Sequence, residues 1–444
     1  MQNSAFRPIY YLGCKTNFTP AIRSAIDEVD PSGGRLADLF AGTGAIGAAL
    51  ATAREVTTVD VQEYSRVLCS AVLSPPELTV SQIDELVSQI GRTRVLQELS
   101  SCLQPLVDYE HACINDAVAG DSAALVELLE SPPLAVLPYG EVRQSSSPLA
   151  EATSKAIDNL VSSKLWQSPD SMMTRQFGGV YFSFRQAAVL DAILSAASQA
   201  PNTIRDVLKA AALSTASQIV NTVGKQFAQP LRPRNKAGHV KGGLVRVVRR
   251  DRLIDALAIY GDWLARYAEM PRVHGTPRAV REDYLVALAE QGASFSVVYA
   301  DPPYTRDHYS RFYHVLETMC LRDDPPISLV RKRGVLGASR GVYREDRHQS
   351  PFCIRSTAPT AFDALFKAAR NRDLPIVLSY SPHESGDGTH PRVVSMRQII
   401  EIARNTYSRV EVCAIEGSTH NKLNSGELEL KTRAHAEVLL KCFR

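Results

Sequence analysis

The tetrapeptide Asp301-Pro-Pro-Tyr304 directly follows the apolar run Ser294-Phe-Ser-Val-Val-Tyr-Ala300, and its residue types suit chemistry on an aromatic amine. Such an amine is a poor nucleophile because its lone pair is delocalised into the ring. A carboxylate and the carbonyl between the prolines can accept both amino hydrogens and localise that lone pair. The prolines stiffen the loop, and the tyrosine offers a flat face for an extruded base. We therefore predict four catalytic residues, namely Asp301, Pro302, Pro303 and Tyr304.

A glycine-rich turn, Gly42-Thr-Gly-Ala-Ile-Gly47, follows a second strand-like run, Leu36-Ala-Asp-Leu-Phe40. Glycines let such a turn tighten and bring its backbone close to a ligand. Asp60 lies 18 residues past Gly42, at the end of the next strand-like run, where a carboxylate can accept hydrogen bonds from ribose hydroxyls. The pattern predicts that Gly42, Gly44 and Asp60 bind a nucleotide-like cofactor, and both a nicotinamide dinucleotide and S-adenosylmethionine would suit it.

The strand before this turn carries a carboxylate, Asp38, among apolar residues. A buried carboxylate is costly unless it is paired, and the ammonium group of a bound methionine moiety would be a suitable partner. A local hydrogen bond or salt bridge is the alternative. Phe40 is expected to pack against either the cofactor or the core.

Strands and helices alternate at both ends of the chain, which is typical of a parallel sheet. Between about Ser74 and Met270 this alternation is lost, and apolar residues recur at helical spacing in 83–106, 203–223 and 253–268. We expect strands at 36–40, 56–60, 294–300 and 375–380, with an antiparallel pair, 409–413 and 436–440, at the end.

Basic residues gather in two stretches that suit a polyanion. The stretch Leu231–Arg252 contains one acid, Asp251, and its glycines predict a pliable loop. The other stretch, Arg331–Arg347, follows the tetrapeptide and could line a groove around an extruded base. The predicted DNA-binding residues are Arg232, Arg234, Lys236, Lys241, Arg246, Arg249, Arg250, Arg340 and Arg344.

Composition indicates an ordinary globular protein of 444 residues with a net charge of only +3. Its eight cysteines form no C-x-x-C pair and predict free thiols in a reducing cytoplasm, with no metal site. The N-terminus has no apolar signal-peptide core, and no stretch approaches the roughly 18 apolar residues of a membrane span. We expect a cytoplasmic protein without a membrane partner.

Further motifs flank those described above. Tyr11-Leu-Gly-Cys-Lys15 precedes the glycine turn, Glu282-Asp283-Tyr284 precedes the strand before Asp301, and Tyr309-Ser-Arg-Phe-Tyr-His314 follows it. Together these motifs resemble the Dam-like adenine-specific DNA methyltransferases of restriction-modification systems. The resemblance covers residues 8–70 and 270–444. Cys14 departs from it, because relatives often carry a second glycine there.

The resemblance implies an α/β fold, with a Rossmann-like S-adenosylmethionine-dependent methyltransferase sheet and a mostly helical inserted DNA-recognition domain. Residues 1–74 would form the cofactor half of the core, 75–270 the target-recognition insertion with its basic loop 231–252, and 271–444 the catalytic half. The implied cofactor-binding residues are Tyr11, Gly13 and Lys15 at the methionine end, Asp38, Phe40, Gly42 and Gly44 around the turn, Asp60 at the ribose, and Asp283 at the cofactor's adenine.

The function that follows is methyl transfer from S-adenosylmethionine to the exocyclic amino group of a flipped adenine in double-stranded DNA. A cognate restriction endonuclease is an expected partner. The tetrapeptide also fits cytosine's amino group, so an RNA or cytosine-amino methyltransferase is an alternative, as is a catalytically inactive DNA-binding relative. A nicotinamide dehydrogenase would explain the glycine turn but not Asp301-Pro-Pro-Tyr304.

Overall fold

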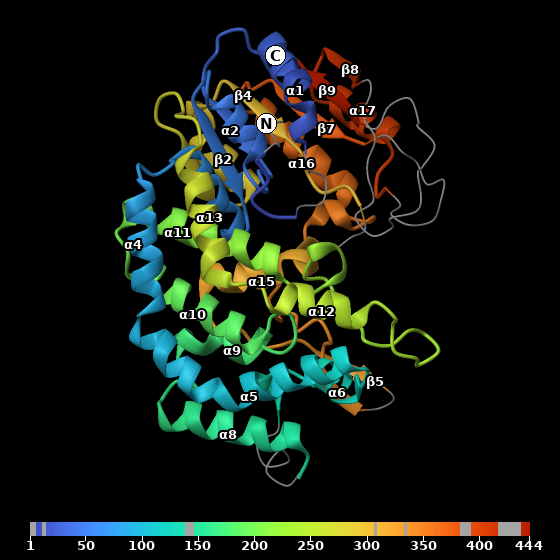
Figure 1. Cartoon of the computed structure of the whole chain (residues 1–444). Helices are drawn as coiled ribbons and strands as arrows, with labels where there is room; N and C mark the ends of the chain where they lie inside the picture. Colours follow the sequence, from blue (N-terminus) through green and yellow to red (C-terminus); the bar gives the residue numbers. More distant parts are fainter. Residues whose placement is uncertain are drawn as a thin grey trace. The chain divides into compact units, whose positions relative to one another are not determined.

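A computed structural model describes residues 6–10, 15–137, 146–305, 309–332, 335–381, 392–415 and 437–444. Tyr11 and Gly13 lie outside the described residues. The chain divides into two compact units (Figure 1). The first, here called the sheet unit, comprises Met1–Pro75, Met270–Ser310 and His348–Arg444. The second, the helical unit, comprises Pro76–Glu269 and Arg311–Arg347.

The sheet unit is built on a seven-stranded, mostly parallel sheet with the order β3-β2-β1-β4-β7-β9-β8. The first five strands run parallel, β9 pairs antiparallel with β7, and β8 pairs antiparallel with β9. The predicted α/β class and closing antiparallel pair are confirmed. Edge strand β3 was not predicted, since its four residues are partly exposed and carry two arginines. The strands are β1 (Leu36–Leu39), β2 (Val56–Asp60), β3 (Arg278–Arg281), β4 (Val297–Ala300), β7 (Ile376–Tyr380), β8 (Val410–Ile415) and β9 (Glu437–Cys442).

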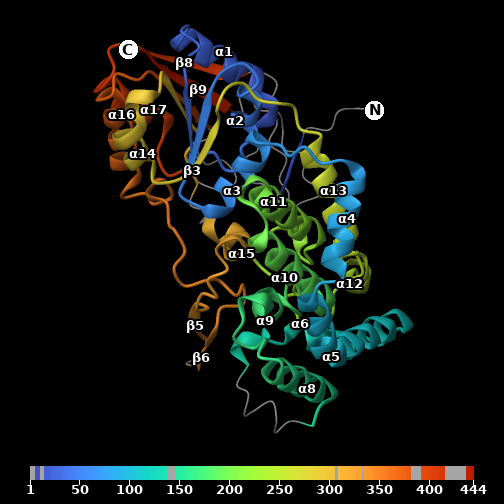
Figure 2. The same cartoon turned by 90° about the vertical axis from the view of Figure 1, so that its left-hand side faces the viewer.

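Helices cover both faces of this sheet, as the continuous burial of its central strands requires. Ala37 and Leu39 of β1 belong to the apolar core beneath α14 (Tyr284–Gln291), α16 (Ala358–Arg370) and α17 (Met396–Arg404). Figure 2 shows these three helices on one side of the strands. The other side carries α1 (Thr19–Val29), α2 (Ala45–Leu50) and α3 (Glu63–Leu73). Successive side chains of a strand point to opposite faces of the sheet, so the side chain of Asp38 points to the face that carries α2.

The helical unit has its own apolar cores. Helix α5 packs against α8 and α10, and α11 packs against α13. The helices are α4 (Val80–Gly91), α5 (Arg94–Ala119), α6 (Ala123–Glu130), α8 (Pro148–Ser162), α9 (Met172–Phe177), α10 (Phe184–Gln199), α11 (Asn202–Ile219), α12 (Leu244–Arg252), α13 (Ala256–Ala268) and α15 (Tyr309–Leu321), with a hairpin of β5 (Leu329–Lys332) and β6 (Val335–Ala338). Among the described residues, no helix is both long and apolar enough to cross a membrane.

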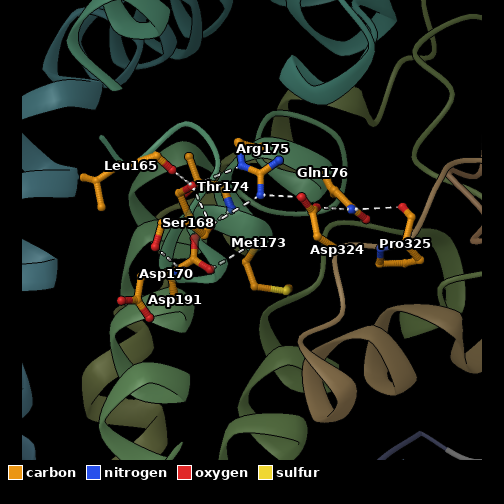
Figure 3. Close-up of polar contacts among 11 residues, drawn as sticks. Leu165, Ser168, Asp170, Met173, Thr174, Arg175, Gln176, Asp191, Asp324 and Pro325 are labelled. Carbon is orange, nitrogen blue, oxygen red and sulfur yellow. Dashed lines mark hydrogen bonds and ion pairs between the residues drawn. The ribbon is translucent and has the colours of Figure 1, made fainter. Parts of the chain in front are cut away.

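Residues 311–347 pack within the helical unit, whereas the sequence-based division assigned them to the catalytic half. Polar contacts of α9 show why (Figure 3). Nη2 of Arg175 donates to Asp324 Oδ2 at 2.8 Å, and Nε2 of Gln176 donates to Asp324 Oδ1 at 2.7 Å. The start of α9 is held in turn by Asp191, which accepts hydrogen bonds from the backbone N–H groups of Met173 and Thr174. The contacts of Asp324 join residues 148 and 149 positions apart, so local patterns could not predict them.

The predicted pliable loop over 231–252 is wrong for its second half, which forms helix α12. Leu244 and Val248 are spaced four residues apart and bury one side of this helix in an apolar core. Arg252, at its end, points inward. Its Nη1 lies 2.5 Å from Oε1 of Glu110, and both side chains are almost fully buried. Only the outer side of α12 therefore remains available to a polyanion.

Candidate active site

Parallel pairing of β1 with β4 brings the two predicted motifs to one edge of the sheet. Asp38 is the register partner of Tyr299, and Leu39 is that of Ala300. Both strands therefore end at the same level, with the glycine turn after one and Asp301 after the other. A single pocket at this edge is lined by Lys15, Asp38, Phe40, Gly42, Asp60, Glu282, Asp283, Tyr284, Tyr299, Asp301, Pro302, Pro303, Tyr304, His348 and Phe352, with their neighbours.

The glycine turn is braced by Asp60 at the end of β2. The N–H of Gly42 donates to Asp60 Oδ2 at 3.0 Å, and the N–H of Gln62 donates to Oδ1 at 2.9 Å. Gly44 has a φ of +74°, and a Cβ there would meet Cys69 at 3.1 Å, so it packs the turn onto α3 and is absent from the pocket lining. Asp60 therefore shapes the turn. Each of its two carboxylate oxygens has a further lone pair that can accept a hydrogen bond.

Asp38 lies under the turn, and the described part of the chain places no counter-ion in a salt bridge with it. Its side chain is 2% exposed, and Oδ2 has no hydrogen-bond partner among the residues that the structure describes. Burial, together with the nearby charge of Asp301, raises the pKa of Asp38 to about 8. A Cβ at Gly47 would lie 3.0 Å from Oδ2, so α2 approaches this carboxylate closely. The site thus holds a buried acceptor that lacks a cation.

Aromatic side chains form an apolar wall of the pocket. The ring of Phe40 lies 5.1 Å from Tyr284 and 5.2 Å from Phe352, and those two rings are 5.5 Å apart. Phe40 has a φ of +61°, a conformation that residues with a side chain rarely adopt, where the chain leaves β1. Asp283 caps α14 by accepting from the N–H of Leu285 at 2.8 Å, and it also lines the pocket.

Lys15 lies beside the predicted catalytic residues, not on the surface. Its side chain is 4% exposed, and Nζ is 3.5 Å from Oδ1 of Asp301 and 3.2 Å from the hydroxyl of Tyr304. The same ammonium group donates to Oε1 of Glu437 at 2.7 Å. Hydroxyl Oγ of Ser379 donates to the same carboxylate oxygen at 2.8 Å. A buried cation is therefore shared between two carboxylates at the reaction end of the pocket.

The ring of Tyr304 is covered in this conformation. Tyr304 is 7% exposed, and the guanidinium carbon of Arg392 lies 4.6 Å from its ring centroid. Tyr380 packs against it edge-on at 5.2 Å. Arg392 is tied to Ser381, with Nη2 donating to Oγ at 2.6 Å. The flat face predicted for an extruded base would have to be uncovered first.

A comparison with known protein families gives a match at the N-terminal end of the chain. Residues 11–102 match the family model of D12 class N6 adenine-specific DNA methyltransferases. This match confirms the resemblance seen in the motifs and supports an adenine-specific DNA methyltransferase. It includes the glycine turn and Asp60, while Asp301-Pro-Pro-Tyr304 lies outside it. No curated protein matches the chain.

The predicted DNA-binding residues fall into three groups, all in the helical unit. Two cations are already paired. Arg234 lies 3.1 Å from Glu130, and Arg250 lies 2.8 Å from Asp251. Arg344 is buried between Asp323 at 2.6 Å and Asp346 at 2.9 Å, so it does not face a ligand. The remaining residues are exposed, namely Arg232, Lys236, Lys241, Arg246, Arg249 and Arg340.

Several pocket residues were missed by sequence reasoning. Segment 348–353 lines the pocket through His348 and Phe352 but carries no recognisable motif. Arg392 and Glu437 reach Tyr304 and Lys15 from distant parts of the chain. The one available signal was the charge of Glu437 directly before the apolar run Val438-Leu-Leu440. Among the described residues, no group of three or more His, Cys, Asp or Glu could hold a metal ion.

Proposed function

We propose that this protein transfers a methyl group from S-adenosylmethionine to the exocyclic amino group of adenine in double-stranded DNA. The supporting observation is the single pocket that contains both the glycine turn and Asp301-Pro-Pro-Tyr304. The family match over residues 11–102 favours adenine over cytosine as the methylated base. Together they support a site in which the cofactor would lie on the glycine turn, beside groups that would activate an amine.

The pocket residues fit S-adenosylmethionine in charge and shape. Asp38, with its unpartnered Oδ2, would bind the ammonium group of the methionine moiety. Asp60 would accept from the ribose hydroxyls. The apolar wall of Phe40, Tyr284 and Phe352 would pack against the adenine ring, with Asp283 beside it. When bound, this cofactor supplies an electrophilic methyl group on a sulfonium.

The residues of the tetrapeptide would prepare the attacking amine. Asp301, with a side chain 21% exposed, and the carbonyl of Pro302 would each accept one amino hydrogen, which localises the nitrogen lone pair. S-adenosylmethionine would supply the methyl group and depart as the neutral thioether, and the proton that the amine loses would pass to Asp301 or to solvent. Positioning of the amine in line with the methyl group would supply much of the rate. No covalent enzyme intermediate is required.

A base that stacks on Tyr304 must displace Arg392 from the ring. We infer that the target adenine is extruded from the duplex, since its amino group is inaccessible in the stack. The cation–π contact between Arg392 and Tyr304 would be exchanged for base stacking. The ring is therefore shielded until DNA arrives.

The helical unit carries two groups of exposed or half-buried arginines that suit a phosphate backbone. Arg246 and Arg249 lie on the outer side of α12. The other group, here called the arginine cluster, surrounds Tyr343, with Arg347 at 4.8 Å and Arg311 at 5.8 Å from its ring centroid. The cluster consists of Arg232, Arg311, Arg340 and Arg347.

Repulsion inside the arginine cluster argues for an anionic ligand. Burial and the neighbouring charge of Arg232 lower the pKa of Arg340, and burial and the charge of Arg311 lower that of Arg347. Cations held together in this way are stabilised when phosphates neutralise them. We propose that the helical unit recognises the DNA target while the sheet unit carries the chemistry, in a cytoplasmic enzyme that acts with a cognate restriction endonuclease.

The test is a methylation assay with tritiated S-adenosylmethionine on plasmid DNA, with rRNA as a parallel substrate. N6-methyladenine in the plasmid, located by sequencing of methylated bases, is the expected product. Asp301→Ala should lose methyl transfer by about a hundredfold or more while cofactor binding survives, because the carboxylate acts on the amine. Full activity in that variant, or methylation of rRNA alone, would refute the proposal.

A further inference from the structure

Glu437 is a fully buried carboxylate at the edge of the pocket, and neither its sequence context nor the family match assigns it a function. It begins strand β9, which runs antiparallel to β7. The start of β9 therefore lies at the edge where the parallel strands end. From there its Oε1 accepts from Lys15 Nζ at 2.7 Å and from Ser379 Oγ at 2.8 Å.

The Lys15 ammonium group sits between two carboxylates at unequal distances. Its bond to Glu437 is short, whereas its distance to Asp301 is 3.5 Å. Burial opposes the charge on Lys15, yet nearby acidic groups raise its pKa well above the ordinary value. The titratable groups that face it are Asp301, Tyr304, Glu437 and Tyr299. Lys15 is thus held as a cation whose principal hydrogen-bond partner is Glu437.

We propose that Glu437 is a positioning residue for methyl transfer, which holds the Lys15 ammonium group beside Asp301 and Tyr304. In that place its positive charge lies 3.5 Å from Oδ1 of Asp301, close enough to stabilise negative charge on that carboxylate. A carboxylate has about four lone-pair sites, so Asp301 can interact with Lys15 and still accept a hydrogen bond from the substrate amine. The inference rests on the proposed function and adds a residue to the same site.

The charge balance of Lys15, Asp301 and Glu437 supports this role. Lys15 and Asp301 alone would form a neutral pair. The amine gains positive charge as it is methylated, and a net negative group stabilises that charge better than a neutral pair does. Glu437 restores one net negative charge to the three side chains. It also competes for the ammonium group, which explains the longer distance from Lys15 to Asp301.

The first test is Glu437→Gln, which keeps the size of the side chain and a hydrogen bond to Ser379 but removes the charge. We expect kcat to fall about ten- to a hundredfold, the equivalent of one charge-assisted hydrogen bond, with little change in KM for DNA. Lys15 keeps Asp301 and Tyr304 but loses one of the groups that favour its protonated form, so its pKa falls. The alkaline limb of the kcat profile should therefore move down by about one to two pH units.

A matched control is Asp30→Asn. Asp30 forms a buried 2.5 Å ion pair with Arg54 in the same unit, and neither residue lines the pocket. This variant should lower the melting temperature without moving the pH profile. If Glu437→Gln behaves in the same way, Glu437 is merely structural and the proposal is overturned.

A double-mutant cycle with Lys15→Met gives a readout that does not need activity. In the Lys15→Met background Glu437 is a buried charge without its cation, so Glu437→Gln should raise the melting temperature there and lower it in the wild type. Equal changes in both backgrounds would show that Glu437 does not act through Lys15. Absence of methyl transfer by the wild-type enzyme would refute the proposed function, and this inference with it.

Discussion

Lowering the pH should weaken cofactor binding through Asp38. Burial raises the pKa of this side chain to about 8, so in the ligand-free protein it is mostly protonated at pH 7. An ammonium group binds the ionised form, which makes up roughly one tenth of the molecules at pH 7 and one hundredth at pH 6. The apparent affinity for S-adenosylmethionine should therefore fall about tenfold from pH 7 to pH 6.

Calorimetry can measure the same linkage directly. Titrations at pH 7 in buffers of different ionisation enthalpy should show release of about 0.9 proton per cofactor bound. Asp38→Asn should abolish this release and weaken binding. A suitable control is Asp191→Asn, since burial raises the pKa of that carboxyl to about 7 in the helical unit, away from the pocket lining. Proton-free binding with a flat pH dependence would refute the role of Asp38 as ammonium acceptor.

The raised pKa of Asp38 should also make the stability of the ligand-free protein depend on pH. The folded state raises the pKa of Asp38 above its unfolded value of 3.8, so the folded state binds the proton more tightly. The contribution of this group is then fully present below about pH 4 and is lost as the pH rises toward 8. Asp38→Asn should therefore melt at a higher temperature than the wild type near pH 8, although it binds the cofactor poorly.

Two further predictions concern the DNA surface and the turn. Replacing Arg311 and Arg340 with glutamine should reduce the slope of log affinity for DNA against log salt concentration by about two. The control Arg94→Gln removes an exposed cation paired with a glutamate on α5 and should leave the slope unchanged. Equal slopes in filter-binding assays would exclude the arginine cluster as a phosphate contact. Gly47→Ala places a Cβ 2.6 Å from a side chain of β2, and a loss of stability of about 1–3 kcal/mol with weaker cofactor binding is expected in thermal melts and calorimetry.

The parts of the site that the sequence predicted are those placed by local structure. The glycine turn and Asp301 each follow an apolar strand, and parallel strands end at one edge of a sheet. Their meeting in one pocket therefore follows from two local patterns and one topological rule. Asp38 was recognisable for a similar reason, because a carboxylate within an apolar strand requires an explanation.

Residues placed by long-range register escaped prediction. Glu437 meets Lys15 across 422 positions, and this contact depends on β9 entering the sheet antiparallel to β7. The motif-bearing segment 311–347 belongs to the helical unit because of contacts such as that of Asp324 with Arg175. A count of basic residues along the sequence selected Arg344 as a DNA-binding residue. Such a count could not show that two acids already pair with this cation.

The pocket as a whole favours a cationic ligand. Asp38, Asp60, Asp283 and Asp301 line the pocket together with one lysine, Lys15, which also pairs with Glu437, so acidic groups outnumber lysines there among the residues that the structure describes. A ligand with a sulfonium and an ammonium group relieves this excess. A ligand whose sulfur has become neutral after methyl transfer relieves it less. Under the proposed function, the same acids would bind the cofactor more tightly than the spent product, which would link the electrostatics of this sheet edge to turnover.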